Sequence, residues 1–276
     1  KHQAEITDPP DVYKKEKIMS KGKEFVKDTI VTAILVDGGF YRRRAYARLG
    51  DKSPKERADE LESYCKRHLN EKIYGIQTSH RLYRIFYYDC LPVSKNIYNP
   101  LTKKQVDLSK TDTYKWATEF FDFLKEKRKF ALRYGQLAEG QAHYSLTEKT
   151  FKKLCNGTIK FEDLEEKDCI LQIEQKGVDM RIGLDIASLA YKKQVDQIVL
   201  ISGDSDFVSA AKLARREGID FILDPLGAPV KPDLFEHIDG LRTSIQILKF
   251  QIKNSKKNYI YKLLYFIIRF NKRYYI

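Results

Sequence analysis

The fold is decided by residues 198–207, which read Ile-Val-Leu-Ile-Ser-Gly-Asp-Ser-Asp-Phe. Four apolar residues in succession are typical of a buried strand, and the residues after Phe207 have the pattern of a helix. Asp204 and Asp206 therefore stand at the carboxyl end of a predicted strand. In open α/β sheets this edge is where ligands bind. The stretch predicts an α/β protein with an acidic ligand site.

Two further segments place an aspartate in the same setting. The apolar run 33–36 ends in Asp37-Gly38-Gly39, and Lys176-Gly177-Val178-Asp179 joins a predicted strand to a predicted helix. Two carboxylates ~4 Å apart repel each other by about 4 kcal/mol at an effective dielectric constant of ~20. A divalent cation would remove that cost, and hard oxygen ligands suit Mg²⁺ or Mn²⁺. We therefore expect Asp37, Asp179, Asp204 and Asp206 to form a metal site that acts on a phosphodiester.

The rest of the chain alternates between strand and helix patterns. Strands are expected at 30–36, 82–88, 130–134, 170–175, 197–202 and 219–224. Helices are expected at 53–69, 111–129, 179–192, 207–217 and 235–242, and one more follows the capping-box pattern Ser145-Leu146-Thr147-Glu148. This alternation predicts one α/β domain, residues 31–248, with a central and mostly parallel sheet that helices cover on both faces.

Both ends of the chain differ from this domain. Residues 1–30 are expected to be a flexible N-terminal extension, with Met19 as a candidate natural start. Residues 249–276 form a basic aromatic tail that contains eight Lys or Arg and no acid. The formal charge of the 276-residue chain is +13, which favours a nucleic-acid partner. Much of that charge belongs to the tail, so it supports nucleic-acid binding by the domain only weakly.

Composition excludes several other classes of protein. The four cysteines form no C-x-x-C pair and have no histidine at metal-ligand spacing, which argues against a zinc site. The first 30 residues lack the apolar core of a signal peptide, and no apolar run approaches the ~20 residues of a membrane span. The expected location is the cytoplasm.

The three acidic segments, in this order along the chain, resemble the motifs of the NYN-domain family, and of its LabA-like bacterial group in particular. Asp37-Gly38 matches the first motif, Lys176-Gly177-Val178-Asp179 with Asp185 the second, and residues 202–207 the third. The resemblance implies a Rossmann-like PIN fold and a metal-dependent ribonuclease. It assigns metal binding and catalysis to Asp37, Asp179, Asp204 and Asp206.

The sequence departs from the family in two respects. Phe40 and Tyr41 follow the glycines, where the family often has an asparagine. Residues 42–80 and 90–170 are long for a minimal PIN-like domain, and as insertions they are expected to gate the site or to recognise the substrate.

Structural roles compete with the catalytic ones. Asp37, Asp179 and Asp206 are also good helix N-caps. Asp185 is either a supporting group of the site or a partner of Arg181. Ser202 is expected to orient a water at the metal or to satisfy its own backbone. Lys176, Arg42 and Arg43 are expected to bind phosphates, with solvated surface positions as the alternative.

These observations lead to one functional hypothesis and its alternatives. The protein is expected to be a Mg²⁺- or Mn²⁺-dependent endoribonuclease that hydrolyses phosphodiester bonds of single-stranded RNA. One alternative is a non-catalytic RNA- or protein-binding module on the same fold. The other is a phosphoesterase that acts on DNA or nucleotides. The oligomeric state stays open, with a homodimer among the options.

Overall fold

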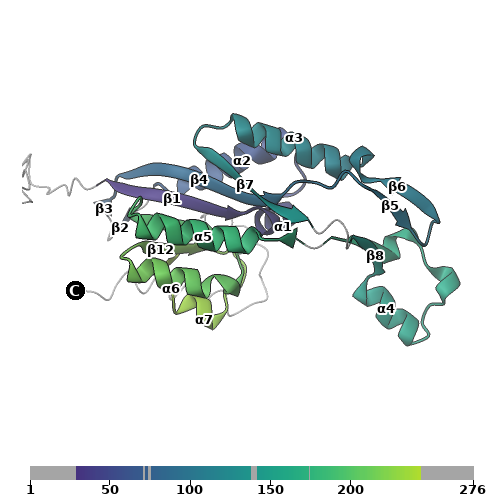
Figure 1. The fold of residues 1–276 in the computed structure, drawn as a ribbon. Coiled ribbons are helices and arrows are strands. Elements are labelled where there is room, and N and C mark those ends of the chain that lie inside the picture. Colours follow the sequence, from purple (N-terminus) through teal and green to yellow (C-terminus); the bar gives the residue numbers. More distant parts are fainter. Residues whose placement is uncertain (1–28, 71, 74–75, 138–141, 174, 244–276) are drawn as a thin grey trace, which may run out of the picture.

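The computed structural model describes residues 29–70, 72–73, 76–137, 142–173 and 175–243. The expected tail 249–276 and all but the last two residues of the expected N-terminal extension lie outside this part. Within it the chain forms a three-layer α/β structure around a seven-stranded, mostly parallel sheet (Figure 1). This confirms the predicted fold class. No helix among the described residues combines the length and the apolar character needed to cross a bilayer.

The sheet has β1 (Ile30–Asp37) near its centre and grows outward in both directions. On one side follow β4 (His80–Cys90), β7 (Phe130–Leu137) and the edge strand β10 (Gln175–Lys176). On the other side follow β11 (Gln197–Ile201), β12 (Asp220–Asp224) and the edge strand β13 (Gly240–Leu241). All neighbours are parallel except β7 and β10. From β1 the chain adds β4 and β7 on one side and later β11 and β12 on the other. The order in which strands are added therefore reverses between β1 and β11, and such sheets bind ligands in the crevice at this point.

Helices cover both faces of the sheet because the central strands are apolar on both sides. Ile34 and Val36 belong to the core under α1 (Gly38–Leu49), α2 (Pro54–Arg67) and α3 (Asp112–Glu126). Ala33 and Leu35 belong to the opposite core under α5 (Val178–Tyr191), α6 (Val208–Arg216) and the short α7 (Pro232–Phe235). Figure 1 shows α2 and α3 on one face of the sheet and α5 and α6 on the other.

A small lobe lies beyond the carboxyl ends of β4 and β7 (Figure 1). It consists of two hairpin-like strand pairs and one helix: β5 (Asn96–Asn99) with β6 (Lys104–Asp107), β8 (His143–Leu146) with β9 (Cys169–Gln172), and α4 (Glu148–Cys155). Val93, Ile97 and Leu108 form a core of its own. Much of the expected insertion 90–170 is thus this lobe, whereas α3 and β7 of the same segment belong to the main layers.

The remaining elements are short. A hairpin of β2 (Lys72–Ile73) and β3 (Ile76–Gln77) precedes β4. Four 3₁₀ turns occur among the described residues, at Leu108–Lys110, Phe161–Asp163, Glu166–Asp168 and Ser205–Phe207. The last of these turns leads from β11 into α6.

Three local predictions are wrong. In place of the expected helix 235–242, the short helix α7 ends at Phe235. The Asp239 carboxylate accepts the backbone N–H of Phe221 at 2.9 Å, and this bond holds the next residues beside β12 as strand β13. The expected strand 170–175 is divided: β9 pairs with β8, and only β10 joins the central sheet. The N-cap of α4 is Thr147 and not Ser145, because the Thr147 hydroxyl accepts the N–H of Thr150.

Candidate active site

Asp37 ends β1 and caps α1 at the point where the order of strand addition reverses. Its Oδ1 accepts the backbone N–H of Phe40 at 2.9 Å, and its Oδ2 accepts the Ser202 hydroxyl at 3.2 Å. Burial raises the pKa of the Asp37 carboxyl most, and the negative charge of Asp179 raises it further. The two hydrogen bonds and the Arg43 guanidinium oppose these effects, yet the pKa stays above its ordinary value. The capping role and a place in the acidic site therefore coexist.

Asp204 and Asp206 follow β11 in the loop that enters α6. The Ser202 hydroxyl accepts the N–H of Asp204 at 3.3 Å while it donates to Asp37, so one side chain ties the two strand ends together. Asp204 in turn caps the 3₁₀ turn, since its Oδ1 accepts the N–H of Asp206 at 3.1 Å. Both aspartates are exposed, so their carboxylates can reach a ligand.

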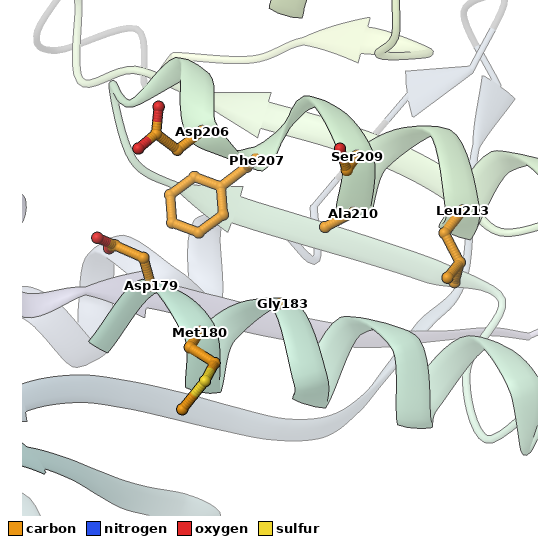
Figure 2. Close-up of a pocket in the computed structure, with 8 residues that line it drawn as sticks. All are labelled: Asp179, Met180, Gly183, Asp206, Phe207, Ser209, Ala210 and Leu213. Carbon is orange, nitrogen blue, oxygen red and sulfur yellow. The ribbon is translucent and has the colours of Figure 1, made fainter. Parts of the chain in front are cut away.

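Asp179 lies in the first turn of α5, which faces this loop. Gly177, two residues before Asp179, has a φ of 78°, a left-handed conformation that glycine adopts without strain. As the N-cap of α5, it sets the direction in which the helix begins. Burial raises the pKa of the Asp179 carboxyl most, and the charges of Asp204 and Asp206 add to the rise. Figure 2 shows the carboxylates of Asp179 and Asp206 at the same end of a groove between α5 and α6.

The four expected acids thus come together in space, from the ends of two strands and the start of one helix. The charge of Asp179 raises the pKa of Asp37, and the charges of Asp204 and Asp206 raise that of Asp179. Oxygen-only ligands fit Mg²⁺ or Mn²⁺ chemically. Among the described residues, however, no three His, Cys, Asp or Glu side chains are grouped closely enough to hold an ion. The donors are suitable, and their side chains would have to draw closer around an ion.

Asp185 lies apart from the other acids. Its Oδ2 accepts the Tyr88 hydroxyl at 2.7 Å and the Nε–H of Arg133 at 3.1 Å. Arg133 is thus its ion-pair partner in place of the expected Arg181. The side chain anchors α5 to β4 and β7, which would support the site only indirectly, through the placement of α5.

The arginines of α1 divide into two groups. Arg42 donates to the carboxylate of Asp89 at 2.9 Å, and this partner ends β4 with a side chain that is 0% exposed. Arg44 and Arg48 donate to the carbonyls of Leu226 and Gly227 at 3.1 and 3.0 Å. Arg43, in contrast, is exposed and close enough to Asp37 to lower the pKa of that carboxyl.

One feature near the acids, Lys231, was not predicted from the sequence. Lys231, which is exposed, donates from Nζ to the Ser205 hydroxyl at 2.9 Å and so brings a cation beside Asp204 and Asp206. Nothing in the sequence around Lys231 signals this, because 26 residues separate it from Ser205. Lys176, which the sequence did single out, is exposed in β10, just before Gly177.

Gly203 allows the loop after β11 to pack closely against Phe40. A Cβ at this position would lie 2.5 Å from the Phe40 ring, so the glycine makes room for an aromatic side chain and not for a ligand. Gly38 is equally constrained: a Cβ there would lie 2.6 Å from Asp89 Oδ2 and from the Tyr87 ring. The start of α1 is therefore packed tightly against β4 and the β11 loop.

Part of the chain matches the model of a known protein family. The family model of the NYN domain matches residues 112–228, which include Asp179, Asp204 and Asp206 and exclude Asp37. This match confirms the family resemblance expected from the motifs. No curated protein matches the chain.

Two solved structures are similar at low TM-score. A protein of unknown function from Vibrio parahaemolyticus is 13% identical, with 81% of this chain and 98% of that chain covered and a TM-score of 0.40. A maltogenic α-amylase, AmyB, from Thermotoga neapolitana is 11% identical, with 88% and 55% covered and a TM-score of 0.23. Likeness at this level has no bearing on function.

Proposed function

We propose that this chain, whose residues 112–228 form an NYN domain of the PIN-like nucleases, is a metal-dependent endoribonuclease that cuts single-stranded RNA. One observation carries the proposal: Asp37, Asp179, Asp204 and Asp206 lie near one another at the crevice beside β1 and β11, where the charge of Asp179 adds to the raised pKa of Asp37 and the charges of Asp204 and Asp206 add to that of Asp179. Carboxylates that repel each other even with Arg43 nearby favour a site for a divalent cation.

The same four residues are those that would hold Mg²⁺ or Mn²⁺. When bound, such an ion supplies activation of water and neutralisation of the phosphate charge. Asp37 is fixed by its bonds to Phe40 and Ser202, so it provides a rigid ligand. Asp179, Asp204 and Asp206 are exposed, and Asp204 keeps its Oδ2 available while its Oδ1 caps the 3₁₀ turn. The role of Ser202 is to orient Asp37 and to hold the Asp204 loop against it.

The cations that would position RNA phosphates are Arg43 and Lys231, with Lys176 at the sheet edge. Arg43 and Lys231 are exposed, Arg43 near Asp37 and Lys231 bonded to Ser205 between Asp204 and Asp206. Arg42, which the sequence also suggested, is engaged by the buried Asp89 and is assigned to the placement of α1 instead.

The sharpest test is the variant Asp179→Asn. The Asp179 side chain is exposed at the start of α5, so the change removes a metal ligand at little cost to folding. Cleavage of a labelled single-stranded RNA in Mn²⁺ should fall by on the order of a hundredfold or more, the scale of losing one preorganised electrostatic group. EDTA should abolish cleavage by the wild type.

The matched control is Asp122→Asn on α3. It removes an equally charged, exposed carboxylate whose partner is Lys125, on the opposite face of the sheet from α5. Its cleavage rate should equal that of the wild type. Wild-type cleavage by Asp179→Asn, or cleavage in EDTA, would overturn the proposal. A parallel assay on single-stranded DNA and on nucleotides separates a ribonuclease from the other phosphoesterases.

A second candidate, an RNA-binding module without catalysis, has its own support. The described residues contain no group of three metal-ligating side chains in close range, and Phe40 packs on Gly203 at the point where relatives often carry an asparagine. This reading predicts RNA binding that persists in EDTA, with no product formed in Mn²⁺.

A further inference from the structure

A groove of about 370 Å³ runs between α5 and the 3₁₀ turn that leads into α6. It begins at Asp179 and Asp206 and extends along both helices as far as Leu213 (Figure 2). At a rise of ~1.5 Å per residue, the groove follows α5 for about 6 Å, from Asp179 to Gly183. Along the facing segment it extends for about 10 Å, from Asp206 to Leu213. The groove therefore starts at the acidic cluster and leads away from it.

Small residues keep the groove open. Gly183 lies in the middle of α5, and a Cβ at this position would meet nothing within 4 Å. A glycine in a helix interior destabilises the helix relative to alanine, and neither a turn nor a close contact of the backbone requires it here. On the facing wall, Ala210 leaves space in the same way. Among the described residues nothing occupies this space.

The walls combine apolar surface with one hydroxyl. Met180, which is 65% exposed, and Leu213 line the groove, and the buried Phe207 ring lies between the helices (Figure 2). Ser209 contributes the hydroxyl and is exposed. Apolar faces with a few polar groups are typical of sites for small planar ligands.

We propose that this groove holds the base of the nucleotide next to the phosphate that the acidic cluster addresses. The inference rests on the proposed function and specifies where the substrate's base lies. The two carboxylates at the groove entrance disfavour an anionic group, and the apolar lining beyond them disfavours a charged group of either sign. A nucleobase fits both conditions, because it is neutral, planar and polar at its edge. Because Asp179 and Asp206 belong to both sites, a phosphate at the acids brings its own nucleoside to the groove.

The variant Gly183→Leu tests this assignment, because it fills the groove without changing any acid. Binding is measured by fluorescence anisotropy in Ca²⁺ with two labelled strands, a single-stranded RNA and a strand of equal length without bases. The wild type should bind the RNA more tightly by on the order of tenfold, as expected for one stacked base. Gly183→Leu should bind both strands equally.

The control is Leu184→Phe, which adds bulk at the next position of α5. Leu184 is exposed and does not line the groove, so this variant should keep the preference for RNA. Ser209→Leu fills the groove from the other wall and replaces Gly183→Leu if that variant does not fold. Thermal melting of each variant verifies the fold.

Several results would overturn the inference. The first is a wild type that binds both strands equally, and the second is a Gly183→Leu variant that keeps the wild-type preference for the base-bearing strand. The third is a change of oligomeric state in that variant, which would make the groove an interface between copies. Cleavage in Mn²⁺ is scored separately. If the wild type cuts RNA and Gly183→Leu keeps the wild-type preference for the base-bearing strand, only the assignment of the groove is refuted. Base-dependent binding without cleavage refutes only the nuclease.

Discussion

Asp37 combines two tasks that usually fall to different residues. It caps α1 through Phe40 and accepts the Ser202 hydroxyl, and it also lies within the repulsive field of Asp179. The hydrogen bonds favour the charged carboxylate, and burial and repulsion favour the neutral acid. The raised pKa shows that the second pair of effects is larger. The charged side chain therefore lowers the stability of the fold in exchange for a poised ligand.

This balance predicts that Asp37→Asn stabilises the protein at neutral pH. Asparagine is as good an N-cap as aspartate, and it removes the buried charge. A carboxyl with a raised folded-state pKa contributes stability below its ordinary value of 3.8, and this contribution is lost as the pH rises through the raised value. The melting temperature of the variant should therefore increasingly exceed that of the wild type as the pH rises from ~4 to ~7.

Divalent cations should reverse this difference. Mn²⁺ should raise the melting temperature of the wild type, since ligands that bind only the folded state stabilise it, and should raise that of Asp37→Asn less. A variant that is less stable than the wild type at neutral pH without metal would contradict the electrostatic account of this site.

At the scale of single residues, the sequence predicted the positions of the four acids better than it predicted their surroundings. Asp37, Asp179, Asp204 and Asp206 could be found because each follows a strand or starts a helix, a local signal. The partners of Asp185 could not be found, because Arg133 is 52 residues away and its choice depends on how β7 lies beside α5. Lys231 was missed for the same reason.

Helix α1 carries three arginines that attach it to the rest of the fold and one that is exposed. Arg44 and Arg48 fasten it to the carbonyls of Leu226 and Gly227 after β12, and Arg42 fastens it to Asp89 at the end of β4. Only Arg43, among these four arginines, is exposed. Equal charges on one helix thus have unequal roles, which their spacing in the sequence does not reveal.

The pair Arg43→Ala and Arg48→Ala tests this division. Each removes one charge from α1. Arg43→Ala should weaken RNA binding and lower the slope of log K against log salt by about 0.7, the value for one phosphate contact with a single strand, at an unchanged melting temperature. Arg48→Ala should lower the melting temperature, because α1 loses its bond to Gly227. Equal effects of both variants on RNA binding would indicate a general charge effect.

Among the elements, those with a clear apolar pattern were predictable, whereas α1 and the two-residue strands were not. The apolar runs of β1 and β11 and the 3-4 spacing of α3 come from burial within one element. Strands β10 and β13 have two residues each and exist only because a neighbouring strand offers backbone partners. A two-residue strand has no periodicity to detect.

For the whole molecule, the distribution of charge leads us to expect two separate sources of affinity for the proposed RNA substrate. The chain carries +13, and residues 249–276 contribute eight cations without an acid. The described domain has its own small set of exposed cations around the acidic cluster, among them Arg43 and Lys231. Affinity from the tail would not depend on the position of the RNA relative to the acids.

Removal of residues 249–276 should therefore change binding more than chemistry. The slope of log K against log salt for a single-stranded RNA should fall by about 0.7 for each tail cation that contacts a phosphate. The maximal cleavage rate at saturating RNA should stay within about twofold of that of the full chain, because the tail contributes none of the acidic residues. An unchanged slope would show that the tail does not contact this RNA.

The two borders of the central sheet limit how copies of this protein can associate. Strands β10 and β13 border the sheet with two residues each, and very short border strands offer few unpaired backbone groups to a neighbouring chain. Association by continuing one sheet into the next is therefore disfavoured along both borders. Where copies of the described part associate, we expect contacts through the helices or the lobe and not through β10 or β13.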